Sequence, residues 1–339
     1  MVEVALIGAG SLTFSKRLIK DILSYPKLQN TSFRLMDIDE TRLQKAAQMT
    51  RTLIDENDLA STVEATTDRR EALEGADYVI CTIHVGGTEP FRNEVESPRE
   101  YGVKQSVGDT LGPGGVFRAL RTIPTMIGLA RDMEELCPDA PLLQHTNPMA
   151  MVCWAVEEAT SIDTYGICHS VQGTAWQISN YVDVPLNELE YWVAGINHMA
   201  WFLKLEHDGN DLYPALKAAM DDEDVYADDV VRFEVMDHFG KFITESSHHL
   251  SEYLPYFRTE QSDIDRLIET SSYDPARGEF EHSPVCWLPT GEYFKEWNSR
   301  DPTAEFDPEE IDTTLEQSHE YASGIIHSLE TDAPRRMNL

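Results

Sequence analysis

The chain has 339 residues, of which 41% are hydrophobic, so it can bury one large core or two modest ones. Aspartate and glutamate number 60 against 27 lysines and arginines, which gives a formal net charge of −33. Such a charge repels nucleic acid, and no apolar run reaches the roughly 20 residues that a membrane helix needs.

The N-terminal residues favour a strand and turn, because they lack the basic flank and cleavage site of a signal peptide. We therefore expect a cytoplasmic protein. The acidic residues are spread along the chain rather than collected in a tail. They are either an ordinary solvated surface or an adaptation to a salt-rich cytoplasm, where about 1 M salt shortens the screening length to about 3 Å. Our hypothesis is that the protein is halophilic.

Strands alternate with helices through the first half of the chain, and each strand is short and apolar. Such alternation is typical of a parallel, doubly wound sheet of the Rossmann type. The predicted strands cover 2–7, 33–36, 78–83, 142–145 and 165–167, and the predicted helices cover 14–25, 40–57, 116–136 and a segment opened by Pro148.

The pattern changes after residue 170. Two strands, 189–196 and 199–205, are predicted to join around Asn197-His198, and the chain from 213 onward is mostly helical. A final helix is predicted over 314–329. We expect a first domain at 1–170 and a mixed α+β domain at 171–339.

A glycine-rich turn, Gly8-Ala9-Gly10-Ser11, follows the first predicted strand. Gly8 permits the tight turn and Gly10 lets a pyrophosphate approach the helix N-terminus. The third glycine of the usual fingerprint is absent, so the turn alone also fits a plain strand–helix connection. Asp37, which ends the second strand, is placed to bind the ribose hydroxyls of NAD, and Gly86 follows the third strand at the ligand-binding edge of such sheets. These features together predict an NAD site.

Five cysteines occur, and no C-x-x-C pair is among them, which argues against a disulfide framework or a zinc knuckle. Three polar segments, 144–148, 166–170 and 195–199, interrupt apolar framework at predicted strand ends. From them, Cys168 and His198 are a candidate pair of metal ligands. The alternative is a small buried cysteine and a satisfied core histidine. The cysteines are Cys81, Cys137, Cys153, Cys168 and Cys286.

Several longer motifs resemble glycoside hydrolase family four, and within it the melibiase-type α-galactosidases. The resemblance follows the chain in order and spans nearly all of it. The motifs lie at 7–11 (IGAGS), 36–39 (MDID), 109–115 (DTLGPGG), 147–151 (NPMAM), 168–174 (CHSVQGT), 195–200 (GINHMA), 244–248 (TESSH), 252–253 (EY) and 321–323 (YAS).

The resemblance implies an enzyme that binds NAD and a divalent metal, usually manganese, and has a fold related to lactate and malate dehydrogenases. The implied reaction oxidises the sugar at C3, removes a proton from C2, eliminates the aglycone from C1, adds water and returns the hydride. It makes residues 1–170 the NAD-binding domain and 171–339 the substrate- and metal-binding domain. Family chains continue past Leu339, so the second domain looks C-terminally incomplete. A dimer or tetramer is also implied.

The resemblance also assigns roles to single residues. Cys168 and His198 would hold the metal against the C2 and C3 oxygens. His169 would protonate the leaving group, although it could instead only orient Cys168. Tyr253 would remove the C2 proton, with Glu245 as the alternative base.

Two further residues, Asn147 and Asp109, are expected to bind sugar hydroxyls. Arg118 and Arg121 are either substrate contacts or, more often for such a helix, solvated side chains. An α-galacturonide is the alternative substrate. A 2-hydroxy-acid dehydrogenase without a metal and an NAD-binding sensor without turnover are the alternative functions.

Overall fold

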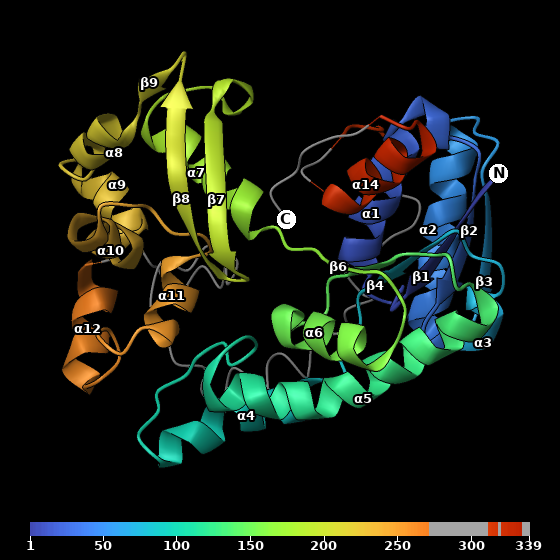
Figure 1. Cartoon of the computed structure of the whole chain (residues 1–339), viewed down its shortest axis with the longest axis horizontal. Helices are drawn as coiled ribbons and strands as arrows, with labels where there is room; N and C mark the ends of the chain where they lie inside the picture. The colour runs from blue at the N-terminus through green and yellow to red at the C-terminus, as the bar shows by residue number, and fades with distance from the viewer. Residues whose placement is uncertain (271–310, 318–319, 334–339) are drawn as a thin grey trace.

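The computed structural model describes residues 1–270, 311–317 and 320–333. The first half forms a six-stranded parallel sheet with the order β3-β2-β1-β4-β5-β6 (Figure 1). This order confirms the predicted Rossmann-type sheet. Its strands are β1 (Val2–Ile7), β2 (Thr31–Met36), β3 (Thr62–Thr66), β4 (Tyr78–Cys81), β5 (Leu142–Gln144) and β6 (Thr164–Gly166).

Helices cover both faces of this sheet, because its strands send alternate apolar side chains to opposite sides. On β1, Val4 and Leu6 pack under α1 and α2, whereas Ala5 and Ile7 pack under α3, α5 and α6. The helices are α1 (Leu12–Ser24), α2 (Glu40–Glu56), α3 (Arg69–Leu73), α4 (Thr88–Glu100), α5 (Gly112–Leu136) and α6 (Met149–Ala159).

The second half begins with α7 (Ser170–Tyr181) and a small antiparallel sheet. The hairpin of β7 and β8 confirms the predicted strand pair, and a cluster of helices lies beside it (Figure 1). Two apolar cores hold this half together. Its elements are β7 (Glu190–Ile196), β8 (Met199–His207), β9 (Asn210–Asp211), α8 (Tyr213–Ala219), α9 (Glu223–Asp228), α10 (Val230–Phe239), α11 (Ser247–Tyr253) and α12 (Gln261–Thr270).

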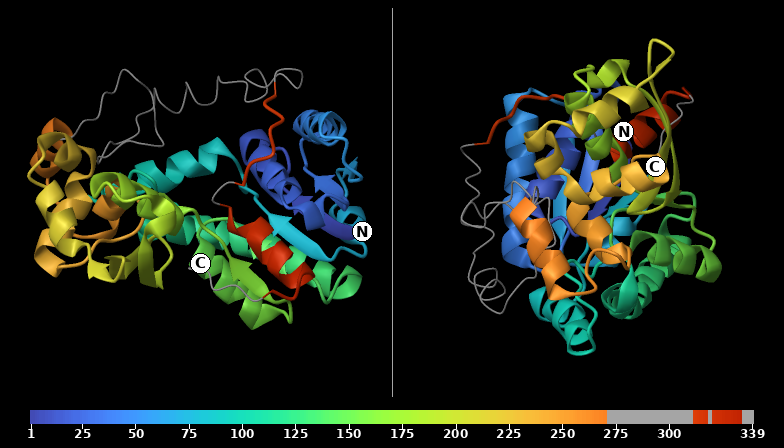
Figure 2. Two further views of the ribbon diagram at one scale, coloured as in Figure 1. Left: turned by 90° about the horizontal axis from the view of Figure 1, so that it is seen from above. Right: turned by 90° about the vertical axis from the view of Figure 1, so that its left-hand side faces the viewer.

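Near its end the chain returns to the parallel sheet. Helix α14 (Tyr321–Glu330) lies against α1, as Figures 1 and 2 show, and buries Ile325 and Ile326 in the same core as β1. The hydroxyl of Tyr78 donates a hydrogen bond to Glu330 at 2.8 Å. The division at residue 170 stays a proposal, and α14 adds a late segment to the first half.

Several of the described elements differ from the prediction. The final helix is predicted from 314, but residues 311–317 are not helical, and within them Lys20 binds the carbonyl and the carboxylate of Asp312 at 3.0 and 2.8 Å. Strand β3 was not predicted, because it is a half-exposed edge strand with Glu64 in its middle and has no apolar run. Helix α4 was not predicted either, because its sequence is strongly polar and contains Pro98.

The cysteines at 81, 137, 153 and 168 are free thiols, and Cys286 lies outside the described residues. Among the described helices, none combines the length and apolar character required to cross a membrane.

Candidate active site

The glycine-rich turn after β1 is tightly constrained by the strands around it. Gly8 has φ +95° and donates its amide to Met36 at 2.9 Å, and a Cβ there would lie 2.8 Å from the backbone of Thr82. The Gly10 amide donates to Asp37 at 2.8 Å, and a Cβ on Gly10 would lie 2.6 Å from that carboxylate. Both glycines are therefore required by close approach, and the turn brings Asp37 to the start of α1.

The N-terminus of α1 is open to an anion. Its cap residue, Ser11, makes no capping hydrogen bond, and the first turn carries no acidic side chain. Backbone amides at such a terminus bind phosphate groups well. Ile38, which is 90% exposed, follows Asp37 and offers an apolar face beside it. Gly86 has φ +88°, and a Cβ there would lie 2.8 Å from Pro90.

A cavity of about 220 Å³ joins this turn to the next strand ends. Its walls include Ser11 of the turn, Thr82 after β4, and His145 and Asn147 after β5. Arg118 of α5 closes another side. The cavity therefore links the proposed nucleotide turn to a residue expected to bind substrate.

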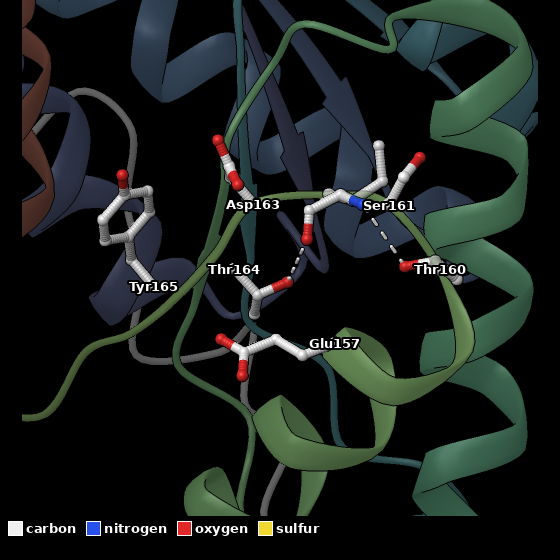
Figure 3. A pocket seen from close by; sticks show the side chains of 7 residues that line it. Glu157, Thr160, Ser161, Asp163, Thr164 and Tyr165 are labelled. Carbon is white, nitrogen blue, oxygen red and sulfur yellow. Dashed lines mark hydrogen bonds between the residues drawn. The ribbon is translucent and has the colours of Figure 1, made fainter.

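A larger cavity of about 350 Å³ lies elsewhere (Figure 3). It is lined by the end of α6, the connection to β6 and the start of β6, including Glu157, Asp163 and Tyr165. This connection precedes β6, whereas Cys168 follows it, so the cavity lies at the opposite end of the strand. Ligands of open parallel sheets bind at the carboxyl ends of the strands, so we do not place the site here.

Cys168, His198 and Glu245 form a cluster of three different metal donors. Sγ of Cys168 lies 3.1 Å from Nε2 of His198, and Glu245 lies 3.8 Å from the same nitrogen. One donor atom of each residue lies within 4.8 Å of the other two. His198 and Glu245 both have positive φ, at 59° and 74°, an uncommon conformation that clusters at functional sites. A thiolate, an imidazole and a carboxylate are a suitable donor set for a divalent transition metal.

Cys168 and His198 shift each other's pKa. Burial raises the pKa of the Cys168 thiol, but the positive charge of His198 and the hydrogen bonds from His198 and Ser170 together outweigh that effect and lower the pKa below its usual value. Burial lowers the pKa of His198, whereas Glu245 and Cys168 raise it to about 10. A divalent cation bound here would displace protons from this cluster, because metal ligands bind in their deprotonated forms.

The other side of His198 is fixed by a hydrogen-bond chain. Oγ1 of Thr110 lies 2.7 Å from Nδ1 of His198 and donates its proton to Asp109 at 2.8 Å. Since this hydroxyl has one hydrogen, it accepts from His198, which places the proton of a neutral ring on Nδ1. Nε2 then keeps its lone pair toward Cys168, as a metal ligand requires.

The two residues predicted to bind sugar hydroxyls, Asp109 and Asn147, are brought together. The Asn147 amide donates to Asp109 at 2.9 Å, and Arg118 lies 4.0 Å from the same carboxylate. Burial raises the pKa of Asp109, but His249, His198 and Arg118 outweigh it and lower the pKa to about 2. Asp109 is therefore an ionised acceptor at neutral pH.

Tyr253, the predicted base, reaches the cluster from α11. Its hydroxyl lies 3.4 Å from Nδ1 of His198. Burial, with Asp109 and Glu252, raises the pKa of Tyr253 well above its usual value. The phenol therefore needs additional positive charge at the site before it can give up its proton.

His169, the predicted acid, points toward the segment that precedes α14. Its Nε2 lies 2.7 Å from Glu320, and its ring lies 5.3 Å from Phe14 and 6.0 Å from His145. Burial lowers the pKa of His169, but Glu320 outweighs it and the net shift is upward. The geometry therefore pairs His169 with a carboxylate that the sequence did not suggest.

A model of family 4 glycosyl hydrolases matches residues 3–184, and a model of the C-terminal domain of that family matches residues 193–339. The chain belongs to this family. An α-galactosidase of Bacillus subtilis is 39% identical over 98% of this chain and 75% of its own length. An α-galacturonidase of Thermoanaerobacter italicus is 33% identical over 76% of this chain and 60% of its own length.

A solved structure shows the same fold. The 6-phospho-α-glucosidase from gut microorganisms, in complex with NAD and Mn²⁺, superposes with a TM-score of 0.69 and is 22% identical. The match covers 97% of this chain and 74% of that one. Membership of family 4 confirms the resemblance inferred from the motifs and favours a glycosidase over a dehydrogenase or a sensor.

Two arginines of this family 4 chain were expected to be solvated, and that expectation is wrong. Arg118 and Arg121 both pair with Glu94, which is 1% exposed, and Arg121 also donates to the Val85 carbonyl at 2.8 Å. Arg118 stacks on the Phe91 ring at 5.5 Å. The reason is that α4, which carries Glu94, was not predicted.

Other residues at the site were missed because their partners are remote in sequence. Thr110 lies 88 positions from His198, and His249, 3.5 Å from Glu245, belongs to a second donor group with Asp109 and His198. Thr110 lay inside a motif already noted, and that motif was the available signal.

Proposed function

We propose that the protein is an α-galactosidase that uses NAD⁺ and a divalent metal, most simply Mn²⁺. The observation that carries this proposal is the donor cluster of Cys168, His198 and Glu245 in a chain whose glycine-rich turn opens into the cavity that ends at Asn147. The identity of 39% to a protein named an α-galactosidase supports the sugar.

The residues fit both groups. NAD⁺ would be held at the N-terminus of α1, where Gly8 and Gly10 let it approach the backbone next to Ser11, with Asp37 at the ribose and Gly86 at the next strand end. The metal would be held by Cys168 and His198. When bound, NAD⁺ supplies hydride acceptance and return at C3, and the metal supplies Lewis-acid stabilisation of charge on the C2 and C3 oxygens.

The protein's own side chains then move protons and orient the sugar. Asp109, an ionised acceptor, and Asn147 bind hydroxyl groups. Tyr253 removes the C2 proton, because the positive charge of the loaded site lowers its high pKa. His169 delivers a proton to the leaving oxygen, and Glu320 holds its ring. Glu245 is the alternative base, but its place among the metal donors makes Tyr253 the better assignment.

The charge around the cavity favours a neutral sugar over a galacturonide. Arg118 lines the cavity, yet Glu94 lies 2.8 Å and Asp109 4.0 Å from its guanidinium group. Both neighbours are carboxylates, so Arg118 has no surplus positive charge for a carboxylate at C6. An uncharged hydroxymethyl group requires none.

The experiment is hydrolysis of p-nitrophenyl α-galactoside in high salt, with NAD⁺ and Mn²⁺ added or withheld singly. Activity that requires both supports the proposed function. Activity that persists after verified removal of NAD⁺ contradicts the redox mechanism. Turnover of the galacturonide alone would replace the substrate.

We also propose that the enzyme works in a salt-rich cytoplasm and as a homo-oligomer. The support for the first is the net charge of −33, whose self-repulsion is reduced when salt screens it. Thermal unfolding with increasing KCl tests it, and a melting temperature that is highest without added salt contradicts it. Light scattering measures the oligomeric state.

A further inference from the structure

A single carboxylate fixes the turn that leads to Asp109. Glu252 accepts hydrogen bonds from three consecutive amides, those of Ser106 and Val107 at 2.8 Å and that of Gly108 at 3.0 Å. The Ser106 hydroxyl adds a longer contact at 3.4 Å. Hydrogen bonds to an ionised acceptor are roughly twice as strong as neutral ones. Three of them on successive residues define the path of the backbone.

The turn at residues 106–108 contacts both halves of the molecule. Gly108 has φ +56°, and a Cβ there would lie 3.2 Å from the Glu94 carbonyl of α4. On the other side, Arg258 and His248 both contact the Ser106 hydroxyl, at 2.8 Å and 2.7 Å. Arg258 and His248, from the second half, therefore bind a segment that belongs to the first half.

The next two residues of the turn are the ones that contact the site. Asp109 binds Asn147, and Thr110 accepts from Nδ1 of His198. Glu252 is also the immediate neighbour of Tyr253 in α11. One side chain thus fixes the turn bearing Asp109 and Thr110 relative to the helix that bears Tyr253.

We propose that Glu252 is a positioning residue, which holds Asp109 and Thr110 against the Cys168–His198 cluster by accepting the amides of residues 106–108. The inference rests on the proposed function for its effect on turnover, but not for its effect on the turn or on the metal donors. Loss of a group that hydrogen-bonds a metal ligand changes metal affinity or activity by about 10–100-fold, and Glu252 acts through Thr110, which makes such a bond to His198.

The test compares Glu252→Gln with Glu134→Gln in the full chain. The substitution at 252 keeps the size of the side chain but turns an NH₂ group toward at least one of the three amides. Glu134 is the matched control, because it accepts the Ser161 amide and hydroxyl at 2.8 and 2.9 Å on an exposed surface. The measurements are amide exchange at 106–108, Mn²⁺ affinity by loss of the free Mn²⁺ resonance signal, NAD⁺ affinity, and kcat and KM.

We expect E252Q to speed amide exchange at 106–108. Mn²⁺ affinity and kcat should each fall by about 10–100-fold, and NAD⁺ affinity should stay within about twofold. E134Q should match the wild type. Unchanged exchange, or faster exchange with unchanged Mn²⁺ affinity, overturns the proposal. Equal loss of NAD⁺ affinity also overturns it, because it shows general unfolding. If the wild type hydrolyses no α-galactoside, the proposed function fails, whereas exchange and Mn²⁺ affinity still decide the role of Glu252.

Discussion

The nucleotide turn and the metal cluster are built in opposite ways. The turn is local: Gly8, Gly10 and Asp37 lie on two adjacent parallel strands and define each other by direct contact. The cluster gathers Cys168 after β6, His198 from a hairpin and Glu245 before α11, and each donor depends on a different supporting element. A substitution at the cluster or at its supporting residues should therefore change both metal affinity and turnover. A substitution at the turn should change only the affinity for the cofactor.

The largest expected effect is removal of a donor. Cys168→Ala should lower kcat/KM by about 10³-fold or more, since Lewis-acid stabilisation is worth several kcal/mol. It should abolish Mn²⁺ binding while NAD⁺ affinity stays within about twofold. Cys153→Ala, at a half-buried free thiol in α6, is the matched control. Intact Mn²⁺ binding in C168A would exclude Cys168 as a ligand.

The next effect concerns the proton at C2. Tyr253→Phe should lower kcat by about 10²–10⁴-fold, the usual contribution of a general base, with little change in Mn²⁺ affinity. The measurement is kcat together with exchange of the C2 hydrogen for solvent deuterium. Exchange that continues at the wild-type rate in Y253F would move the role to Glu245.

A smaller effect should follow from the hydrogen-bond chain behind His198. Thr110→Val keeps the shape but removes the acceptor of the Nδ1 proton, so Mn²⁺ affinity should fall by about 10–100-fold. Thr110→Ser keeps the hydroxyl and should restore most of it. Equal affinities in T110V and T110S would show that the hydroxyl does not set the orientation of the ring.

The smallest effect belongs to the nucleotide turn. Gly10→Ala would press a methyl group against Asp37 and break the amide hydrogen bond, which is worth about 1 kcal/mol, so NAD⁺ should bind about fivefold more weakly. Mn²⁺ affinity should not change, as titration calorimetry can show. A matching fall in Mn²⁺ affinity would mean that the two regions are not separable.

Much of the parallel sheet could be predicted because its signals are local. Short apolar runs marked β1, β2, β4 and β5, and glycines marked the turn that follows β1. The polar edge strand β3 and helix α4 gave no such signal. Missing α4 hid Glu94, and Arg118 and Arg121 were in consequence expected to be solvated.

The sequence by itself determined the fold class, the family and the residue types of the site, because each of these depends on short motifs that can be interpreted within one segment of the chain. Only the tertiary structure decided which groups support them. Thr110 against His198, Glu252 against Val107, and Glu320 against His169 are pairs separated by 88, 145 and 151 positions. These contacts exist because packing of the two halves brings remote segments together. The periodicity of a single segment carries no information about which remote segment it will contact.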